Sequence, residues 1–271
     1  MAEDRFQLNG KVALVTGGAG ILGRRFCRAL AGHGAEVAIV DIDADGAGRL
    51  ADEIARDTGR RTLPVACDLR DPKAVKRMTE TVLSKLGRID VLHNNAAGKS
   101  SDLDAFFASF EEYSLKQWRE IMAIDLDAMF LVAQSVGRHM IARGGGGSVI
   151  QTASIYGVVG ADQRIYAGSE YNGRPINTPA VYAAAKAGVI GLTRHLAAYW
   201  APHGIRVNSL TPGGVESGQN DTFKQRYADR VPLARMAAPD EMVGALVYLA
   251  SDASSYMTGQ NVVVDGGLTA W

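Results

Sequence analysis

The most informative residues of this chain are a tyrosine and a lysine four positions apart, Tyr182 and Lys186. On a helix, residues i and i+4 share a face, so the phenol and the ammonium point the same way. An ammonium beside a phenol favours the phenolate and lowers its pKa from about 10 toward working pH. Such a tyrosine can exchange a proton with an alcohol or a ketone. Because this spacing is common on solvated helix faces, its meaning depends on the residues that precede it.

A glycine-rich turn near the start of the chain supplies that context. The apolar run 11–15 leads into the turn at 16–23, and 24–31 has a helical pattern. A strand, a glycine turn and a helix in this order present backbone N–H groups to a pyrophosphate, and glycines allow its close approach. We therefore predict a dinucleotide site that includes Gly17, Gly20, Ile21 and Leu22. From this segment alone, a turn that serves packing only is the alternative.

The next expected strand, 36–40, ends at Asp41, eighteen residues after Gly23. A carboxylate there is suited to bind the hydroxyls of an adenosine ribose, and it would repel a 2′-phosphate. The sequence therefore favours NAD over NADP, with Arg24 and Arg25 as a mild counterweight.

Short apolar strands alternate with helices along the whole chain. Strands are expected at 11–16, 36–40, 62–66, 89–93, 148–152, 205–210 and 261–264, and helices at 22–32, 44–57, 72–86, 115–142, 180–202 and 239–250. This alternation predicts parallel βαβ units and an α/β fold of the doubly wound Rossmann type, a mostly seven-stranded parallel sheet with helices on both faces. No composition shift marks a boundary, so 1–271 is expected to be one domain. Ligands of such sheets bind at the carboxyl ends of the strands.

Six motifs follow one another in the order typical of the short-chain dehydrogenase/reductase family, which this chain resembles over nearly its whole length. They are the glycine turn, Asn94-Asn95-Ala96-Ala97, Ser154, the Tyr182/Lys186 pair, Asn208-Ser209-Leu210-Thr211-Pro212-Gly213 and Val264-Asp265-Gly266-Gly267. The resemblance implies that Ser154 polarises the substrate oxygen and that Tyr182 exchanges its proton. Lys186 would bind the nicotinamide ribose and lower the pKa of the tyrosine.

The resemblance also implies cofactor contacts and an oligomer. Asp68 and Leu69 would meet the adenine ring, and Asn95 would line the cofactor groove. The nicotinamide would be bordered by Pro212, Gly213 and Val215 and touched by Ser217, which stands where a threonine is common. Family members commonly pair the helices that correspond to 115–142 and 180–202, so a homotetramer or homodimer is expected.

Two residues depart from the family pattern. Ile21 occupies the place of the second glycine, and the spacing Gly17, Gly20, Gly23 follows the family's longer sugar-epimerase branch. We interpret this as a variant turn without loss of the cofactor. Asp125 stands where the catalytic tetrad usually has asparagine; a carboxylate can accept from a water of the proton relay but cannot donate as an amide does.

An insertion is the third departure. Ser154 precedes Tyr182 by twenty-eight residues, about twice the family's usual interval. The extra segment 160–179 is polar, and loops on a rigid scaffold often determine specificity. Its donors and acceptors suit a hydroxylated substrate such as a sugar or polyol, with Arg164 or Arg174 as a clamp for an anionic group and Glu170 or Asn172 for hydroxyls. Alternatively, the segment is a surface loop or forms a contact between subunits. The segment 213–235 is expected to contain a short helical lid over the substrate.

Composition excludes several other classes of protein. The chain has 29 basic and 29 acidic residues and 47% hydrophobic residues, so nothing favours binding to nucleic acid or an anionic membrane. The polar segment 1–11 has no secretory apolar run, no stretch is long enough to span a bilayer, and Cys27 and Cys67 read as core residues of a reducing compartment. A cytoplasmic protein is expected. The histidines are scattered singly, so no metal site is expected.

Three functions are compared. The first is an NAD-dependent oxidoreductase that acts on a secondary alcohol or ketone, with a small-molecule substrate such as a sugar or polyol. The second is a nucleotide-sugar epimerase or dehydratase; such enzymes generally carry a larger C-terminal substrate domain than the four residues after Gly267. The third is a non-catalytic NAD-binding protein, since fold does not fix function. The presence of Ser154, Tyr182 and Lys186 favours the first.

Overall fold

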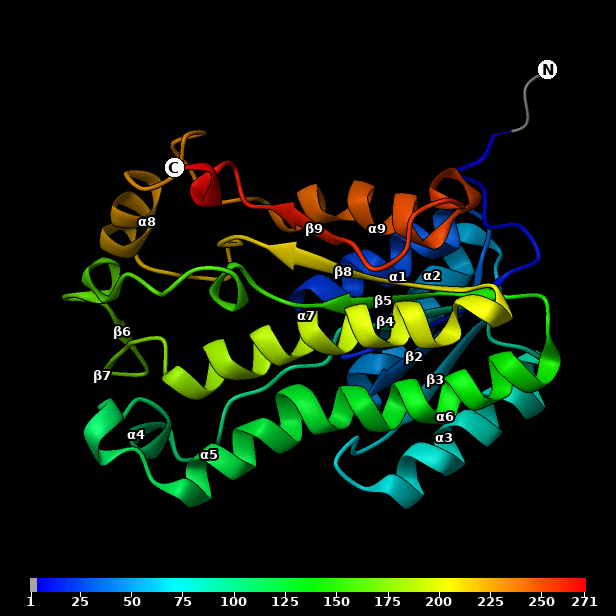
Figure 1. Cartoon of the computed structure of the whole chain (residues 1–271), viewed down its shortest axis with the longest axis horizontal. Helices are drawn as coiled ribbons and strands as arrows, with labels where there is room; N and C mark the ends of the chain where they lie inside the picture. Colours follow the sequence, from blue (N-terminus) through cyan, green and yellow to red (C-terminus); the bar gives the residue numbers. More distant parts are fainter. Residues whose placement is uncertain (1–3) are drawn as a thin grey trace.

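The computed structural model describes residues 4–271, which form one seven-stranded sheet between two layers of helices (Figure 1). Its strands are β1 (Val12–Thr16), β2 (Glu36–Asp41), β3 (Thr62–Ala66), β4 (Val91–Asn94), β5 (Gly147–Thr152), β8 (Ile205–Pro212) and β9 (Asn261–Val264). Their order is β3-β2-β1-β4-β5-β8-β9, and every neighbouring pair is parallel. The order reverses between β1 and β4, which is where such sheets bind ligands.

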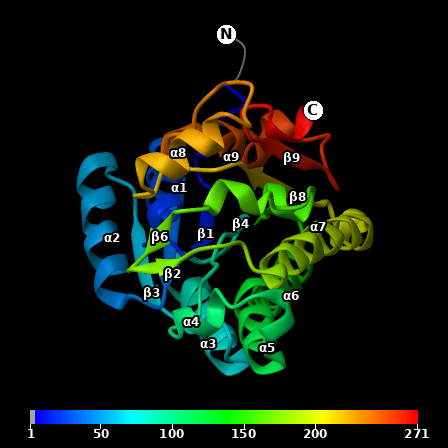
Figure 2. The ribbon, with the colours of Figure 1, turned by 90° about the vertical axis from the view of Figure 1, so that its left-hand side faces the viewer.

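The helices divide between the two faces of the sheet. They are α1 (Ile21–Gly32), α2 (Ala44–Thr58), α3 (Pro72–Leu86), α5 (Leu115–Met122), α6 (Ala128–Arg143), α7 (Ala180–Trp200) and α9 (Val243–Ala250). In β1, Ala13 and Val15 pack in the core with α1, α2 and α9, whereas Val12 and Leu14 pack with α3 and α6 on the opposite face. This alternation follows from the two-residue period of a strand, and Figure 2 shows the two helical layers on either side of the sheet.

Polar side chains fix where the helices after β2 and β3 begin. The side chain of Asp43 accepts a hydrogen bond from Gly46 N and caps α2, and Asp71 accepts from Lys73 N and caps α3. Each such cap stabilises a helix by about 1 kcal/mol. Gly59 and Gly87 end these helices in the left-handed conformation. Both helices therefore begin just beyond the carboxyl ends of their strands, beside the ligand-binding edge.

Smaller elements extend beyond that edge of the sheet, at the left in Figure 1. They are α4 (Leu103–Phe106), α8 (Asp221–Ala228) and the antiparallel hairpin of β6 (Glu170–Tyr171) and β7 (Arg174–Pro175). The hairpin lies inside the insertion 160–179, and α8 lies inside the segment 213–235, where a short helix was expected.

The predicted fold class is confirmed, and the seven strands lie where the sequence placed them, with small differences at their ends. One expectation needs correction, because the helix expected over 115–142 is interrupted by a π-helical segment at Ala123–Asp127. The expected helix 239–250 begins with a 3-10 turn at Pro239–Met242. Residues 1–3 of the expected domain lie outside the described residues. Within the described residues, no helix is long and apolar enough to cross a membrane.

Candidate active site

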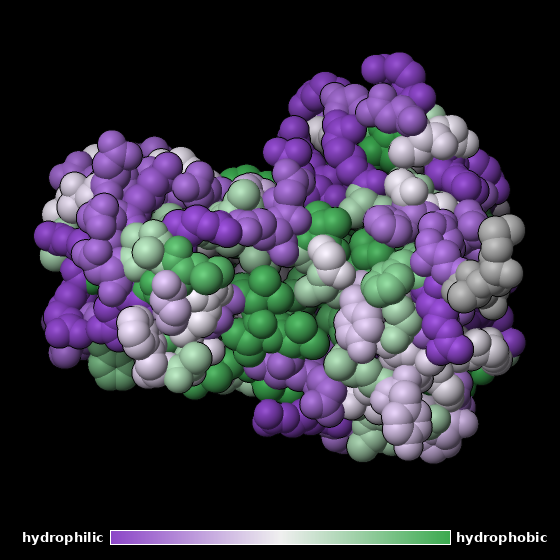
Figure 3. All heavy atoms as spheres, turned by 90° about the horizontal axis from the view of Figure 1, so that it is seen from above, coloured by the Kyte–Doolittle hydropathy of each residue, from purple (hydrophilic) through white to green (hydrophobic). Residues whose placement is uncertain are grey.

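A groove of about 860 Å³ runs across the carboxyl ends of the strands, where the strand order reverses. Figure 3, which views the molecule from the α8–α9 side, shows a notch between the end that carries α8 and the larger remainder. All but one of the residues predicted to bind the cofactor line this groove: Gly17, Gly20, Ile21, Leu22, Asp41, Asp68, Leu69, Asn95, Tyr182, Lys186, Pro212, Gly213 and Val215.

The glycine turn requires glycine at two of its positions. Gly17 has a φ of +63°, and a Cβ there would lie 2.9 Å from Ala96 Cα. A Cβ at Gly23 would lie 2.0 Å from the carbonyl oxygen of Gly17, so the turn can pack on α1 only with glycine at 23. Gly20 caps α1 without a side-chain hydrogen bond, and this leaves the first N–H groups of the helix for an anion.

Ile21 replaces the usual glycine without disturbing the turn. It is the first residue of α1, its side chain is 54% exposed, and it lines the groove. The interpretation as a variant turn therefore fits the structure.

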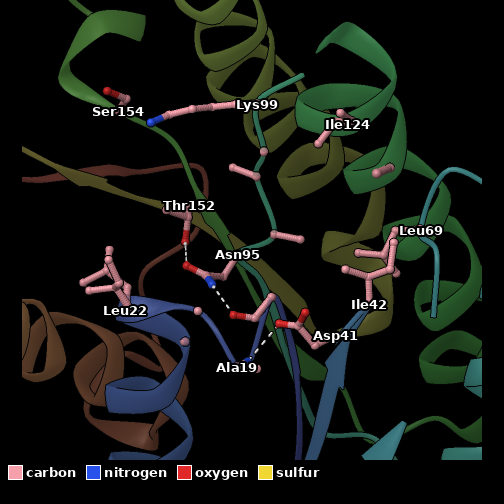
Figure 4. Close-up of a pocket in the computed structure, with 18 of the residues that line it drawn as sticks. Ala19, Leu22, Asp41, Ile42, Leu69, Asn95, Lys99, Ile124, Thr152 and Ser154 are labelled. Atoms are coloured by element: carbon pink, nitrogen blue, oxygen red, sulfur yellow. Dashed lines mark hydrogen bonds between the residues drawn. The ribbon is translucent and has the colours of Figure 1, made fainter. Parts of the chain in front are cut away.

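At one end of the groove, Asp41 joins β2 to the glycine turn. Its carboxylate accepts a hydrogen bond from Ala19 N at 2.9 Å (Figure 4). It also accepts one from Asp43 N at 3.0 Å. Each carboxylate oxygen has a second lone pair, so both can still accept from ribose hydroxyls.

The two arginines whose sequence positions favoured NADP contact other residues. Arg24 donates through Nε to the carbonyl of Ala19 at 2.6 Å, and Arg25 lies 3.6 Å from the carboxylate of Asp240. Neither side chain lines the groove. An arginine that was not predicted, Arg70, does line it and forms a bidentate pair with Asp68. Its position in the sequence, two residues after Asp68, could have predicted that Arg70 lies near the groove.

Asn95 joins the middle of the groove to the strands beneath it. Its amide donates to the carbonyl of Thr16 at 3.1 Å. Its Oδ1 accepts from the Thr152 hydroxyl at 3.3 Å (Figure 4). The structure thus gives Asn95 an architectural role beside its predicted place in the groove.

The three residues predicted to do the chemistry lie together at the other end of the groove. Ser154 follows β5, and Tyr182 and Lys186 lie on the first turns of α7. The Lys186 ammonium donates to the carbonyl of Thr152 at 3.2 Å and lies 5.7 Å from the centroid of the Tyr182 ring. The predicted constellation is assembled in this structure.

The expected direction of the tyrosine pKa is wrong for this arrangement. Burial raises the pKa of Tyr182 to about 12, Ser154 beside it acts to lower it, and Asp125 raises it further. Burial also lowers the pKa of Lys186. Desolvation disfavours both charged forms, and the sequence spacing carries no information about it.

Asp125 lies in the π-helical segment and is fully buried. Its Oδ1 accepts from Gly98 N at 2.9 Å, whereas its Oδ2 has no hydrogen-bond partner among the described residues. Burial raises the pKa of Asp125, and the nearby Lys186 opposes that shift. Asp125 does not line the groove, so its predicted part in a relay would have to act through Lys186.

A second cavity, of about 490 Å³, adjoins the groove and has the size of a small-molecule site. The two cavities share five residues, namely Ile21, Lys99, Ser154, Tyr182 and Gly213. Its walls come from the insertion and from α8. Hydroxyl and amide side chains line it: Tyr156, Tyr166, Ser169, Asn177, Thr178, Gln219 and Asn220.

Several residues expected at the substrate lie elsewhere. Arg164 is paired with Asp162, and Arg174 with Asp104, on the surface. Neither arginine lines the second cavity, so both expectations of an anion clamp are corrected.

Within the insertion, Glu170 lines the second cavity, but Asn172 occupies the hairpin turn with a φ of 51°. Ser217, predicted to touch the cofactor, lines the second cavity and not the groove. The sequence reasoning missed Lys99, which lies two residues after the Asn94-Asn95-Ala96-Ala97 motif and borders both cavities.

Comparisons with known proteins agree with this geometry. A family model described as enoyl-(acyl carrier protein) reductase matches residues 17–269. The D-threitol dehydrogenase of Mycolicibacterium smegmatis is 37% identical over 97% of this chain and 95% of its own length.

Two solved structures share the fold over almost the whole chain. A short-chain type dehydrogenase/reductase from Mycobacterium marinum has a TM-score of 0.87 at 35% identity and covers 99% of this chain and 98% of its own. A gluconate 5-dehydrogenase from Burkholderia cenocepacia, in complex with NADP and tartrate, has a TM-score of 0.85 at 34% identity with the same coverage. The chain belongs to the short-chain dehydrogenase/reductase family and is a nicotinamide-dependent oxidoreductase of alcohols.

Proposed function

We propose that this protein is an NAD-dependent dehydrogenase of a secondary hydroxyl on a sugar, a polyol or a related hydroxylated compound. The observation that carries the proposal is the junction of the two cavities. The groove with the dinucleotide geometry meets the second cavity at Ser154 and Tyr182, so a substrate oxygen bound there contacts both hydroxyls.

The residues at the junction have distinct roles in this proposal. The cofactor, when bound in the groove, accepts or supplies the hydride. Ser154 donates a hydrogen bond to the substrate oxygen, and Tyr182 takes the proton during oxidation or returns it during reduction. Lys186, held by the carbonyl of Thr152, places its positive charge beside the ring of Tyr182 and stabilises the phenolate that forms.

The preference for NAD rests on Asp41. Asp41 lines the groove, and the two arginines near the glycine turn, Arg24 and Arg25, are bound to other partners. The gluconate 5-dehydrogenase neighbour was crystallised with NADP, so the family includes the other choice. The cofactor must therefore be measured directly.

The hydroxylated substrate class rests on the second cavity. Its lining contains tyrosine hydroxyls and the amides of Asn177, Gln219 and Asn220. Tyr166 joins the hydroxyls of Tyr156 and Thr178 in one hydrogen-bonded chain. A site that pairs hydroxyl groups rejects analogues that lack them, because its own polar groups would stay unpaired. The D-threitol dehydrogenase among the relatives supports this class.

A homo-oligomer formed through α6 and α7 is part of the proposal. Phe130 of α6 and Tyr199 of α7 are 46% and 67% exposed, so each of these helices presents a large side chain that a second copy of the chain would cover. Light scattering after size-exclusion chromatography tests it, and a monomeric mass at micromolar concentration would contradict it.

The decisive experiment for the function is a screen of sugars, polyols and hydroxy acids for NADH formation, with NADP in parallel. We expect turnover of at least one compound with a secondary hydroxyl, and loss of that turnover in Tyr182→Phe. Conversion of a nucleotide sugar without net NADH formation would instead indicate an epimerase. Tight NAD binding without turnover of any compound would indicate a non-catalytic protein.

A further inference from the structure

Lys99 is a cation at the junction of the two cavities, and no acidic residue among the described residues 4–271 pairs with it. It lines both the groove and the second cavity, and Figure 4 shows its side chain extending toward Ser154, away from the Asp41 end. The side chain is exposed, yet its surroundings partly desolvate the ammonium and lower its pKa.

Two aromatic rings hold the ammonium in place. Its Nζ lies 4.1 Å from the centroid of the Tyr171 ring and 6.0 Å from that of Phe107. A cation over an aromatic face gains about 0.5–2 kcal/mol, but a ring offers no hydrogen-bond acceptor in its plane. The rings therefore orient the ammonium and leave its N–H groups for another partner.

The backbone beside Lys99 is fixed as well. Gly98 N donates to the buried carboxylate of Asp125 at 2.9 Å, and a Cβ on Gly98 would lie only 3.0 Å from Ile124 Cγ2. Tyr171, in turn, belongs to the hairpin of the insertion. The insertion thus contributes to the site through Tyr171, which holds Lys99, a cation from outside the insertion.

We propose that Lys99 binds a carboxylate of the substrate, and that the preferred substrates are hydroxy acids such as aldonates, with their neutral alditols as poorer substrates. This inference rests on the proposed dehydrogenase function and names its substrate class. A carboxylate beside Lys99 places the reacting hydroxyl a short distance away at Ser154 and Tyr182.

The charge of the cavity favours a carboxylate over a phosphate. Lys99 and Glu170 are the two charged residues among those that line the second cavity. One ammonium matches one carboxylate, whereas a phosphate monoester carries about −1.5 to −2 at pH 7 and would meet Glu170 without a second cation. No arginine lines this cavity to form a bidentate pair with a phosphate.

The test compares substrates that differ only at carbon 1, which is a carboxylate in one and a neutral hydroxymethyl group in the other. The pairs are threonate with threitol, arabinonate with arabinitol, and gluconate with glucitol. Steady-state kcat/KM with NAD and with NADP is measured for the wild type, Lys99→Gln and Lys99→Arg. The matched control is Lys73→Gln, which removes the charge of an exposed lysine on α3.

We expect the wild type to prefer at least one carboxylate over its alditol. Lys99→Gln should lower kcat/KM for that carboxylate roughly 10- to 100-fold, the loss of one charge-assisted hydrogen bond. It should change kcat/KM for the alditols by no more than about 3-fold, as Lys73→Gln should for all substrates. Lys99→Arg keeps the charge and should retain most of the preference.

A binding measurement separates the two proposals. Titration calorimetry with tartrate and with threitol, in the presence of NADH, reports binding without turnover, because the reduced cofactor cannot accept a hydride from an alcohol. If polyols are oxidised but carboxylates neither bind nor react, the assignment of Lys99 is overturned and the dehydrogenase function stands. If no compound is oxidised but tartrate binds the wild type and not Lys99→Gln, the dehydrogenase function is overturned. Equal losses for acids and alditols in Lys99→Gln, or a sugar phosphate as the preferred ligand, would also overturn the carboxylate assignment.

Discussion

Replacing Asp41 by alanine should change which cofactor the enzyme uses. The carboxylate lies at the end of the groove opposite the reactive residues and holds Ala19 N and Asp43 N at 2.9 and 3.0 Å. Asp41→Ala removes the acceptors for ribose hydroxyls and the negative charge that opposes a 2′-phosphate. The substitution therefore acts on NAD and NADP in opposite directions.

The size of each effect can be estimated. Loss of a charge-assisted hydrogen bond to the ribose costs roughly 1.5–3 kcal/mol, about 10- to 150-fold in kcat/KM for NAD. Two unit charges 4 Å apart repel by about 1 kcal/mol in water and about 4 kcal/mol at an effective dielectric of 20, so removing one charge favours NADP by about 5-fold or more. The NAD to NADP ratio of kcat/KM should fall at least about 50-fold.

The assay is initial-rate kinetics with each cofactor at a saturating concentration of one alcohol. Asp45→Asn is the matched control, because Asp45 is an exposed carboxylate of the first turn of α2 and does not line the groove. Its cofactor ratio should stay within about 2-fold of the wild type. A wild type that already prefers NADP, or equal losses for both cofactors in Asp41→Ala, would refute the reasoning.

Three further predictions concern the proton, its pH dependence and the turn. Tyr182→Phe should lower turnover about 10²- to 10⁴-fold. The affinity for NADH, measured by fluorescence, should stay within a few-fold of the wild-type value. Turnover near the wild-type value would exclude Tyr182 as the acid and base. Because the pKa of Tyr182 is raised to about 12, the phenolate is scarce at pH 7. The value of kcat/KM for oxidation should therefore rise about tenfold per pH unit from pH 7 to 9, whereas kcat/KM for reduction, which uses the protonated phenol, should stay flat. A flat oxidation profile would contradict this assignment. Gly23→Ala should lower the Tm and abolish NAD binding, since its Cβ would lie 2.0 Å from Gly17 O. Gly48→Ala, in the open middle of α2, should instead stabilise the protein by about 0.5–1 kcal/mol, and equal Tm shifts in the two variants would show that the turn tolerates a Cβ.

The sheet was predictable because its signals are local. Each strand is a short apolar run between turn residues, and two of the helices that follow, α2 and α3, begin at a side-chain cap, Asp43 and Asp71. The π-helical segment at 123–127 has no such signal, because the helical period continues through it. The hairpin at 170–175 did have one: Asn172-Gly173 is a pair that favours a two-residue hairpin turn.

The cofactor groove was predictable for a related reason. Its residues follow predicted parallel strands, and the carboxyl ends of those strands meet at one edge. Ser217 lies outside the groove because it belongs to a connection, where a shift of a few residues along the chain changes the cavity that a side chain reaches. The prediction for the pKa of Tyr182 was wrong for a different reason. Sequence spacing shows which groups are neighbours, whereas burial decides which charge state they favour.

The substrate cavity shows what a sequence pattern leaves open. Arg164 and Arg174 lie in the insertion and were credible anion clamps, yet Asp162 and Asp104 already neutralise them. Lys99 comes from a different strand end, and only the fold places it under Tyr171 of the insertion. An exposed arginine pairs readily with a neighbouring carboxylate, and such pairs contribute little energy. Lys99 is held by aromatic rings, faces a cavity and has no carboxylate partner among residues 4–271, so it is a better guide to the substrate than the more numerous charges of the loop itself.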